Sequence, residues 1–355
     1  MKSRLGWVSL LFLLFTSVVT AGLPVSVRWA GMGYSGLALS DTEDAFTVNP
    51  AALFRMAPTL FSIDLGYMDS FAHPAAEAFE VLPLINEPVN QFDFTFATPF
   101  SALSVALDYT LGERESDPAQ NRVSYTAYNN SLIRLNLAFG NDILAVGAYA
   151  QGGATLYRPV ALDQENVLLD YISQVYFSRY YPSGMQQTFT TGAGLLVTYP
   201  YFSFGVLTDS LFGYDSETNE ITYDLQSMVD ELSVGFAFSS EKYDSDVQLS
   251  RYVVTTSFDF TDIGDEEHRA IRFGGELKVQ FLNDLFIAIQ AGYSESRPLP
   301  EPYFGFDWEG ITTFGLGARF QDIQFSSAFQ VPALWFSSAS GDQRMEVAMT
   351  LTYMF

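Results

Sequence analysis

The sequence has no cysteine, few basic residues and, after its N-terminal region, no long hydrophobic run. The absence of cysteine excludes a fold that disulfide bonds hold together. A membrane-spanning helix needs about 18 to 20 consecutive apolar residues, and no stretch beyond the run from Trp7 to Val19 approaches that length. The chain is therefore either soluble or crosses a membrane as β-strands.

Positive charge and histidine are also scarce. Seventeen Lys and Arg stand against 41 Asp and Glu, a net charge of -24, which excludes nucleic acid as a partner. The only histidines are His73 and His268, and neither has a Ser or Asp at the spacing of a known nucleophile motif. We therefore predict no enzyme, no catalytic residue, no metal site and no cofactor.

The N-terminus has the pattern of a Sec-type signal peptide. Lys2 and Arg4 precede the apolar run, which ends in the small residues Thr20 and Ala21. An uncleaved anchor is the alternative, but the run is short and lacks stop-transfer charges. We predict a signal peptide over residues 1–21 and a mature chain that begins near Gly22.

Alternating segments of about ten residues follow from Thr59 onward, which is the length and period of a tilted strand that crosses a bilayer. In the first, Phe61, Ile63 and Leu65 share one face, while Ser62 and Asp64 share the other. We count about fourteen such segments. The first two segments lie near 59–67 and 92–97. The other twelve lie at 102–111, 130–139, 143–153, 188–199, 201–209, 231–239, 246–259, 270–282, 285–294, 311–320, 322–331 and 344–355.

The connections between these segments alternate between short turns and long loops, with long ones predicted at 112–129, 154–187 and 210–230 among others. Outer-membrane barrels have this asymmetry, with short periplasmic turns and long external loops. A soluble β-sandwich is the alternative, but it has no reason to alternate its connections so regularly. We predict an all-β fold, a transmembrane antiparallel β-barrel of about fourteen strands over residues 59–355, located in the outer membrane.

The last segment alternates up to Phe355, the C-terminal residue. This ending resembles the C-terminal signal of outer-membrane barrels, which implies that the barrel-assembly machinery is a partner.

Residues 22–58 do not alternate. A barrel of this size has an interior too wide for wall side chains to fill, so we predict that this segment is an N-terminal plug. Gly31, Gly33 and Gly36 formally match a dinucleotide-binding fingerprint, but no βαβ unit surrounds them, and we interpret them as sites of close backbone packing. A short helix is expected to start at Asp41–Asp44 and to end at Asn49-Pro50.

The same segment carries a family resemblance. Its Gly-rich turn, acidic helix start and Asn-Pro-Ala motif lie at Ala30-Gly31-Met32-Gly33, Gly36, Leu39, Asp41, Asp44-Ala45 and Asn49-Pro50-Ala51. This pattern resembles the hatch of the FadL-type long-chain fatty-acid transporters of outer membranes, and PorV-like shuttle proteins share it. Val48 and Ala52 depart from the family pattern, which has an aromatic residue and a Gly there. The resemblance implies that the segment gates a channel.

Several charged residues have the phase of the polar, inward face. We expect Arg134 and Arg272 to receive an anionic head group, whereas Lys278 and Arg319 hold the plug through Asp41 and Asp44. The alternative is that these residues pair with carboxylates of the barrel interior.

The longest predicted loop contains apolar residues at helical spacing. We expect them to form the wall of a groove through which a hydrophobic ligand enters, or to pack against neighbouring loops. They are Leu168, Leu169, Ile172, Val175 and Tyr176.

These features together predict a monomeric, passive outer-membrane channel for long-chain fatty acids or similar hydrophobic small molecules, in contact with outer-membrane lipid. One alternative is a PorV-like subunit that docks exported proteins, or a surface antigen without transport. A polar porin is a further alternative, which would require an aqueous path past the plug.

Overall fold

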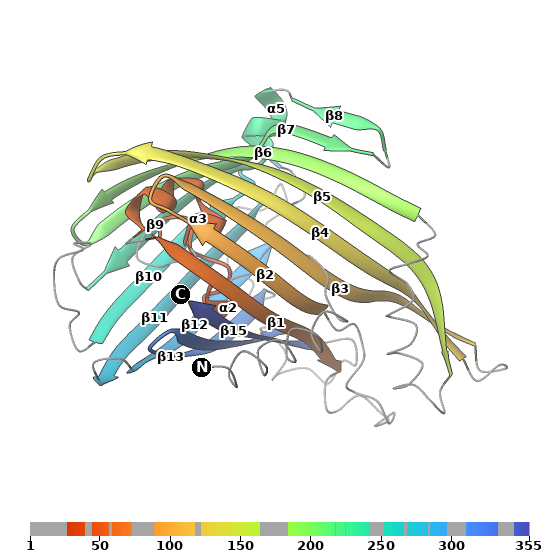
Figure 1. Cartoon of the computed structure of the whole chain (residues 1–355). Helices are drawn as coiled ribbons and strands as arrows, with labels where there is room; N and C mark the ends of the chain where they lie inside the picture. The colour runs from red at the N-terminus through yellow and green to blue at the C-terminus, as the bar shows by residue number, and fades with distance from the viewer. Residues whose placement is uncertain are drawn as a thin grey trace, which may run out of the picture.

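A closed antiparallel β-barrel surrounds a short helical segment in the computed structural model of the chain (Figure 1). The structure describes residues 27–39, 45–56, 59–72, 89–117, 122–163, 184–216, 218–223, 225–240, 252–265, 268–282, 285–296, 310–332 and 344–354. No helix in these ranges is long and apolar enough to span a bilayer.

Helices are few, and strands make up most of the described residues. The helical elements are α2 (Val27–Gly31), α3 (Ala45–Val48), the 3₁₀ helix η1 (Pro50–Arg55) and α5 (Leu225–Asp230). The strands are β1 (Leu60–Ala72), β2 (Val89–Ala97), β3 (Ser101–Asp117), β4 (Arg122–Gly140), β5 (Leu144–Asp163), β6 (Gly184–Tyr199), β7 (Phe202–Asp215), β8 (Glu220–Thr222), β9 (Leu232–Ser239), β10 (Tyr252–Thr261), β11 (Ala270–Leu282), β12 (Leu285–Ser296), β13 (Ile311–Phe320), β14 (Ile323–Pro332) and β15 (Arg344–Met354).

Sequential neighbours pair around the ring, which closes where β1 pairs with β15. Of the 15 strands, β8 pairs only with β7, and β7 also pairs with β6 and β9. Fourteen strands therefore form the wall. The prediction of an all-β barrel of about fourteen strands is confirmed.

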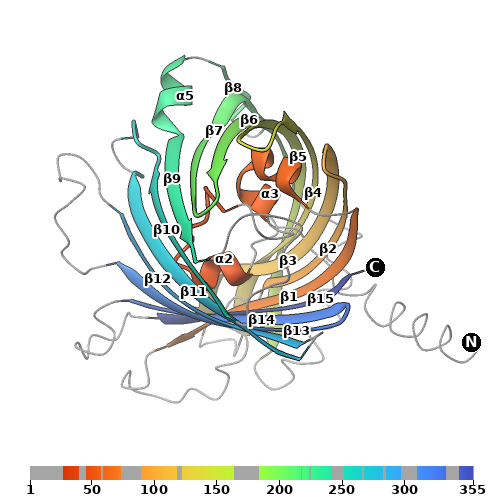
Figure 2. The same ribbon diagram turned by 90° about the vertical axis from the view of Figure 1, so that its left-hand side faces the viewer.

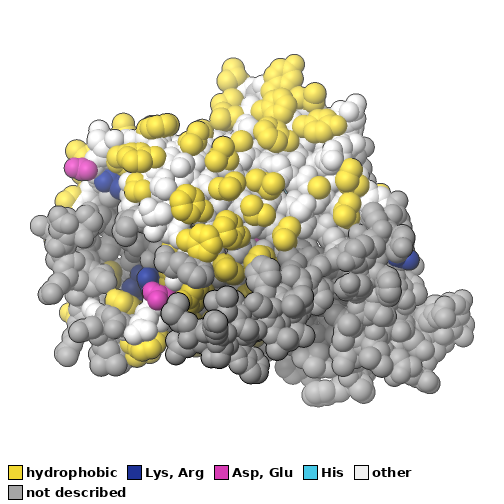
Figure 3. Space-filling model, in the orientation of Figure 1, with side chains coloured by type: hydrophobic (Ala, Val, Ile, Leu, Met, Phe, Trp, Pro, Cys, Tyr) yellow, Lys and Arg dark blue, Asp and Glu magenta, His cyan; other side chains and the backbone are white. Residues whose placement is uncertain are grey.

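The two faces of the wall differ as the alternation predicted. On β4, the side chains of Ile133, Leu135 and Phe139 are exposed on the outside, whereas Arg134 and Asn136 are buried on the inside. Hydrophobic side chains cover much of the described outer surface in Figure 3, and charged ones are few there. A closed barrel with an apolar exterior is the architecture of outer-membrane proteins, and the chain is of this kind.

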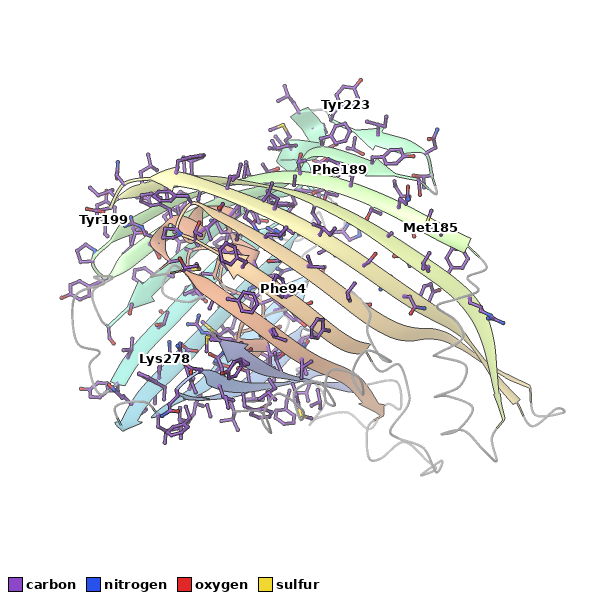
Figure 4. All side chains as sticks on the ribbon, in the orientation of Figure 1. Phe94, Met185, Phe189, Tyr199, Tyr223 and Lys278 are labelled. Carbon is purple, nitrogen blue, oxygen red and sulfur yellow. The ribbon has the colours of Figure 1, made fainter. Side chains whose placement is uncertain are left out.

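The two ends of the barrel carry connections of different length. Tight turns join β2 to β3, β4 to β5, and β6 to β7 at the end where Tyr199 lies, and Met185 lies at the opposite end of β6 (Figure 4). The end with short turns is the periplasmic one in outer-membrane barrels.

Three predicted loops are wrong in extent. β3 and β4 continue until only residues 118–121 separate them, and β5 and β6 continue until only 164–183 do. The predicted loop 210–230 contains the end of β7, all of β8 and α5. Outside the bilayer a strand does not need an apolar face. Strand pairing can therefore continue where the alternation of apolar and polar residues, from which the strands were predicted, has ended.

The described residues 27–39 and 45–56, called here the inner segment, lie inside the ring (Figure 2). α2 contacts β12 to β15, and η1 contacts β4, β5 and β6. Small residues on the inner face of the wall make room for them. Phe46 and Leu53, for example, pack against buried alanines of β2, β3 and β4.

Glycines on the wall allow the inner segment to approach the wall backbone directly. A Cβ added to Gly147 would lie 2.4 Å from the Ala51 nitrogen, and one on Gly274 would lie 2.2 Å from the Met32 oxygen. Wall glycines in such contact with the inner segment are Gly147, Gly194, Gly205, Gly235, Gly274, Gly292 and Gly315. Gly33 has a φ of +67° beside the Tyr293 backbone, so close backbone packing explains its place in the glycine motif.

Candidate functional site

A buried ion pair joins the inner segment to the wall. The guanidinium of Arg28 in α2 binds Glu276 of β11 through two contacts of 2.7 Å each, Nε to Oε2 and Nη2 to Oε1. Gln290 donates a further hydrogen bond of 2.8 Å to the same carboxylate. The paired geometry satisfies both carboxylate oxygens, which a buried charge requires.

A second carboxylate binds the backbone of the inner segment. Oδ2 of Asp259 in β10 accepts hydrogen bonds from the backbone nitrogens of Gly36, at 2.6 Å, and Leu37, at 2.9 Å. Nearby, the hydroxyls of Ser35 and Ser257 are 2.7 Å apart. The turn that follows α2 is thus held by polar contacts with β10.

Asn49 organises the Asn-Pro-Ala motif. Its Oδ1 accepts a hydrogen bond of 3.0 Å from the Ala51 nitrogen, which caps η1, and Pro50 occupies the start of this 3₁₀ helix. Its Nδ2 donates to the carbonyl oxygens of Leu37 at 3.0 Å and Leu195 at 3.2 Å. The side chain therefore connects both parts of the inner segment to β6.

Polar side chains form a cluster on the inner face of β4, β5 and β7. Arg134 lies over the Tyr149 ring, 3.8 Å from the centroid, and its Nε donates to Oδ1 of Asn136 at 3.1 Å. The Tyr149 hydroxyl donates to Oδ1 of Asp209 at 2.6 Å. Gln151 faces Arg134 across the β4–β5 ladder. We call these five residues the Arg134 cluster.

The Arg134 cluster holds unused hydrogen-bonding capacity. Nδ2 of Asn136 and Oε1 of Gln151 are buried and have no hydrogen-bond partner among the described residues. Buried polar atoms without a partner are uncommon, and each needs an explanation, such as a bound molecule that completes its hydrogen bonds.

The cluster lies directly beside the inner segment. Tyr149 belongs to a buried apolar group with Leu37, Val48 and Leu207, against which Trp29 packs. Tyr149 and Gln151 follow Gly147 on β5, which begins at the periplasmic turn. The cluster therefore borders the inner segment on its extracellular side.

Arg272 lies on another side of the ring. β5, β6, β7, β9 and β10 stand between its strand and that of Arg134, so the fold does not bring the two predicted head-group residues together. Arg272 faces Asp259 across the β10–β11 ladder. Burial raises the pKa of Asp262, just past the end of β10, while the charge of Arg272 lowers it. Two carboxylates thus lie near Arg272, although its Nε is buried and has no hydrogen-bond partner among the described residues.

Of the other predicted site residues, the structure describes some and not others. Nζ of Lys278 lies 3.9 Å from Oε1 of Glu276, and Nε of Arg319 donates to the Gln321 oxygen at 3.3 Å. The proposed partners Asp41 and Asp44 lie outside the described residues, so this anchoring stays a prediction. The predicted signal peptide, the loop residues Leu168, Leu169, Ile172, Val175 and Tyr176, and Phe355 also lie outside them.

The sequence reasoning missed Arg28, Asn136, Tyr149, Asp209 and Asp259. Strand phase places the last four on the inner face, so their orientation was available from the sequence. Their grouping depends on strand register and on the path of the inner segment, which alternation does not determine.

No protein family model matches the sequence, and no curated relative matches it. Several solved structures are similar to the chain. The CymD monoaromatic hydrocarbon channel is 11% identical, with a TM-score of 0.55, over 92% of this chain and 96% of that one. The Pseudomonas putida toluene transporter TodX is 14% identical, with a TM-score of 0.53, over 95% of this chain and 99% of that one.

The Ralstonia pickettii toluene transporter TbuX is similar too, at 12% identity and a TM-score of 0.51, over 92% of this chain and 97% of that one. The alignments cover nearly the whole of each chain, although few aligned residues are identical. The chain therefore has the fold of outer-membrane hydrocarbon channels, and the FadL-type resemblance of its sequence holds at the level of the fold.

Proposed function

We propose that the chain is a passive outer-membrane channel for hydrophobic small molecules, with the inner segment as its hatch. The Arg134 cluster carries this proposal, because it presents a buried cation and unpartnered polar atoms to the barrel interior beside the inner segment. The fold shared with hydrocarbon channels and toluene transporters supports it.

The ligand class that we propose is long-chain fatty acids, or similar molecules with an apolar body and one polar head group. The Arg134 guanidinium and the free donor of Asn136 suit a carboxylate, and the unpartnered Gln151 oxygen suits a hydroxyl. A fatty acid would be captured at the extracellular side, held at the Arg134 cluster and released after the hatch moves.

Binding of a labelled long-chain fatty acid to detergent-purified protein tests this proposal. Arg134→Ala should weaken binding by about 10- to 100-fold, because a hydrogen bond to a charged group contributes about 1.5–3 kcal/mol. Arg272→Ala tests whether the second predicted head-group residue contributes to binding, since two carboxylates, Asp259 and Asp262, already lie near it. Ile133→Ala, the neighbouring residue on the outer face of the same strand, is the matched control and should bind as the wild type does.

Toluene as a competitor separates the two ligand classes. If toluene binds and the fatty acid does not, the channel takes neutral aromatic molecules and the head-group assignment is wrong. If neither ligand binds, the transport proposal fails, and docking of exported proteins becomes the better explanation.

A further inference from the structure

Part of β7 separates from β9, its neighbour in the barrel wall. β7 pairs with β9 only as far as Thr208, and a bulge interrupts its pairing with β6 between Thr208 and Phe212. Beyond the bulge β7 pairs with β6 again, but its other edge, from Gly213 to Asp215, pairs with β8 in place of β9. β8 has no other partner among the described strands. We call residues 212–216, 218–223 and 225–230 the paddle, since it projects beyond the ring of strands (Figures 1 and 2).

The paddle keeps the two-faced pattern of the wall although it is not part of the ring. The register of β6, β7 and β8 places apolar side chains together on the outer face, where the rings of Phe189 and Phe212 are 5.9 Å apart. Figure 4 shows Phe189 and Tyr223 on this side of the molecule. The apolar members of this face are Met185, Phe189, Phe212, Tyr214, Ile221 and Tyr223, and two polar residues of β6, Gln187 and Thr191, share it.

The opposite face of the same sheet is polar. Nε2 of Gln186 donates to Oδ2 of Asp215 at 2.9 Å, and Thr222 pairs with Gly213 on this side. Placing apolar side chains on one face and polar ones on the other does not stabilise a hairpin that has water on both faces. Each Å² of apolar surface that stays exposed to water costs about 25 cal/mol. The pattern requires an apolar partner on one face only.

The apolar face is exposed and is continuous with the lipid-facing wall. Ile221 is 54% exposed and Tyr223 74%, and β6 carries the same outer face from the paddle down to the periplasmic turn. Phe189 precedes Tyr199, at that turn, by ten residues, and a tilted strand crosses the hydrocarbon core in about 9 to 11 residues. Phe189 and Phe212 therefore lie at the outer membrane–water interface, where aromatic side chains concentrate.

We propose that the paddle is a lipid-binding element, whose apolar face lies on the outer leaflet of the membrane while its polar face turns to water at the mouth of the barrel. Its occupant is bilayer lipid rather than a second protein, because the face extends a surface that already contacts lipid and lies at the same depth. This inference does not depend on the transported ligand.

The natural absence of cysteine gives a clean test by single-site labelling. Ile221→Cys and Tyr223→Cys place an environment-sensitive fluorophore on the apolar face, and Thr222→Cys is the matched control on the opposite face of the same strand. Ile133→Cys marks the lipid-facing wall, and Asp322→Cys marks a periplasmic turn. Each full-length variant is reconstituted into phosphatidylcholine vesicles that contain nitroxide-labelled lipid, and aqueous iodide is the second quencher.

Nitroxide lipid should quench positions 221 and 223 to the same extent as position 133, and position 222 much less. Iodide should give the reverse order. If iodide quenches 221 and 223 as strongly as 322 while nitroxide lipid has no effect, the paddle stands in water and the proposal is wrong. Protection from both quenchers, with cross-linked dimers, would assign the face to a second copy and overturn the proposal too. Tyr214→Cys, on the same face of the paddle, replaces any paddle variant that does not fold.

Discussion

The two parts of the inner segment are attached to the same barrel by a different balance of contacts. Residues 27–39 add a buried ion pair, Arg28–Glu276, and the bonds from Gly36 and Leu37 to Asp259 to their apolar packing. Residues 45–56 rely more on apolar contacts of Phe46, Leu53 and Met56 with small wall residues. Their hydrogen bonds to the wall include two to backbone oxygens, from Asn49 to Leu195 and from Arg55 to Asp142.

This difference matters for any motion of the segment. Buried polar contacts depend on distance and direction, so a small displacement breaks them at high cost. Apolar contacts are non-directional and tolerate displacement as long as surface stays buried. In the hatch proposed above, residues 27–39 would be the fixed part, and residues 45–56 would be the part able to shift. Hydrogen exchange, which measures the free energy of local opening region by region, distinguishes the two.

The largest effect is expected from Arg28→Ala. Removing Arg28 takes the nearest counter-charge away from the buried Glu276 and leaves it Lys278, at 3.9 Å, and the hydrogen bond from Gln290. Breaking a buried ion pair costs about 3–5 kcal/mol, and these remaining partners place the expected loss toward the lower value. Hydrogen exchange should show this loss of protection in residues 27–39, with little change in 45–56. The double variant Arg28→Ala/Glu276→Ala is the control and should lose less. Equal loss in both parts of the single variant would show that the inner segment opens as one unit.

Leu53→Ala should affect the other part. Leu53 is fully buried, and truncation of such a side chain costs about 2–5 kcal/mol. The loss of exchange protection should fall on residues 45–56 and should not depend on salt. Leu53→Met keeps the volume and should cost less than about 1.5 kcal/mol. Salt-dependent protection in this part would mean that charges, not apolar contacts, hold it.

Gly147→Ala tests the close approach of the inner segment to the wall. The new Cβ would meet the backbone of Pro50 and Ala51, and overpacking of this kind costs about 1–3 kcal/mol. Gly152→Ala on the same strand is the matched control, because its nearest neighbour would be 3.9 Å away. Equal exchange protection in the two variants would show that η1 does not sit against Gly147.

The smallest effect is expected from Asn49→Ser. The neutral hydroxyl still caps η1 through the Ala51 nitrogen, but the variant loses the donations to Leu37 and Leu195, each worth about 0.5–1.5 kcal/mol. Exchange should quicken modestly in both parts, since Asn49 connects them. Asn49→Ala removes the cap as well and should have the greater effect. If Asn49→Ser behaves as the wild type does, the two parts are not coupled through this side chain.

The sequence was sufficient to predict the barrel because lipid on one face imposes a period of two on every strand. The inward phase of Arg134 and Arg272 followed from the same period. The extensions of β3, β4 and β5 could not be predicted, because strands outside the bilayer do not need that alternation.

The contacts of Arg28 were beyond sequence reasoning for another reason. Its partner Glu276 is 248 residues away, and only the closed ring brings the two together. The paddle was assigned to a loop because its strands are short and the bulge at residues 209–211 changes their phase.

The position of the inner segment also sets an order of events in folding. Its residues are synthesised before the wall, yet they contact strands from β2 to β15. The contacts of α2 with β13, β14 and β15 cannot form until the last strands have been made, and contacts so distant in sequence form slowly. The part of the chain that precedes the wall in the sequence is therefore among the last to complete its contacts.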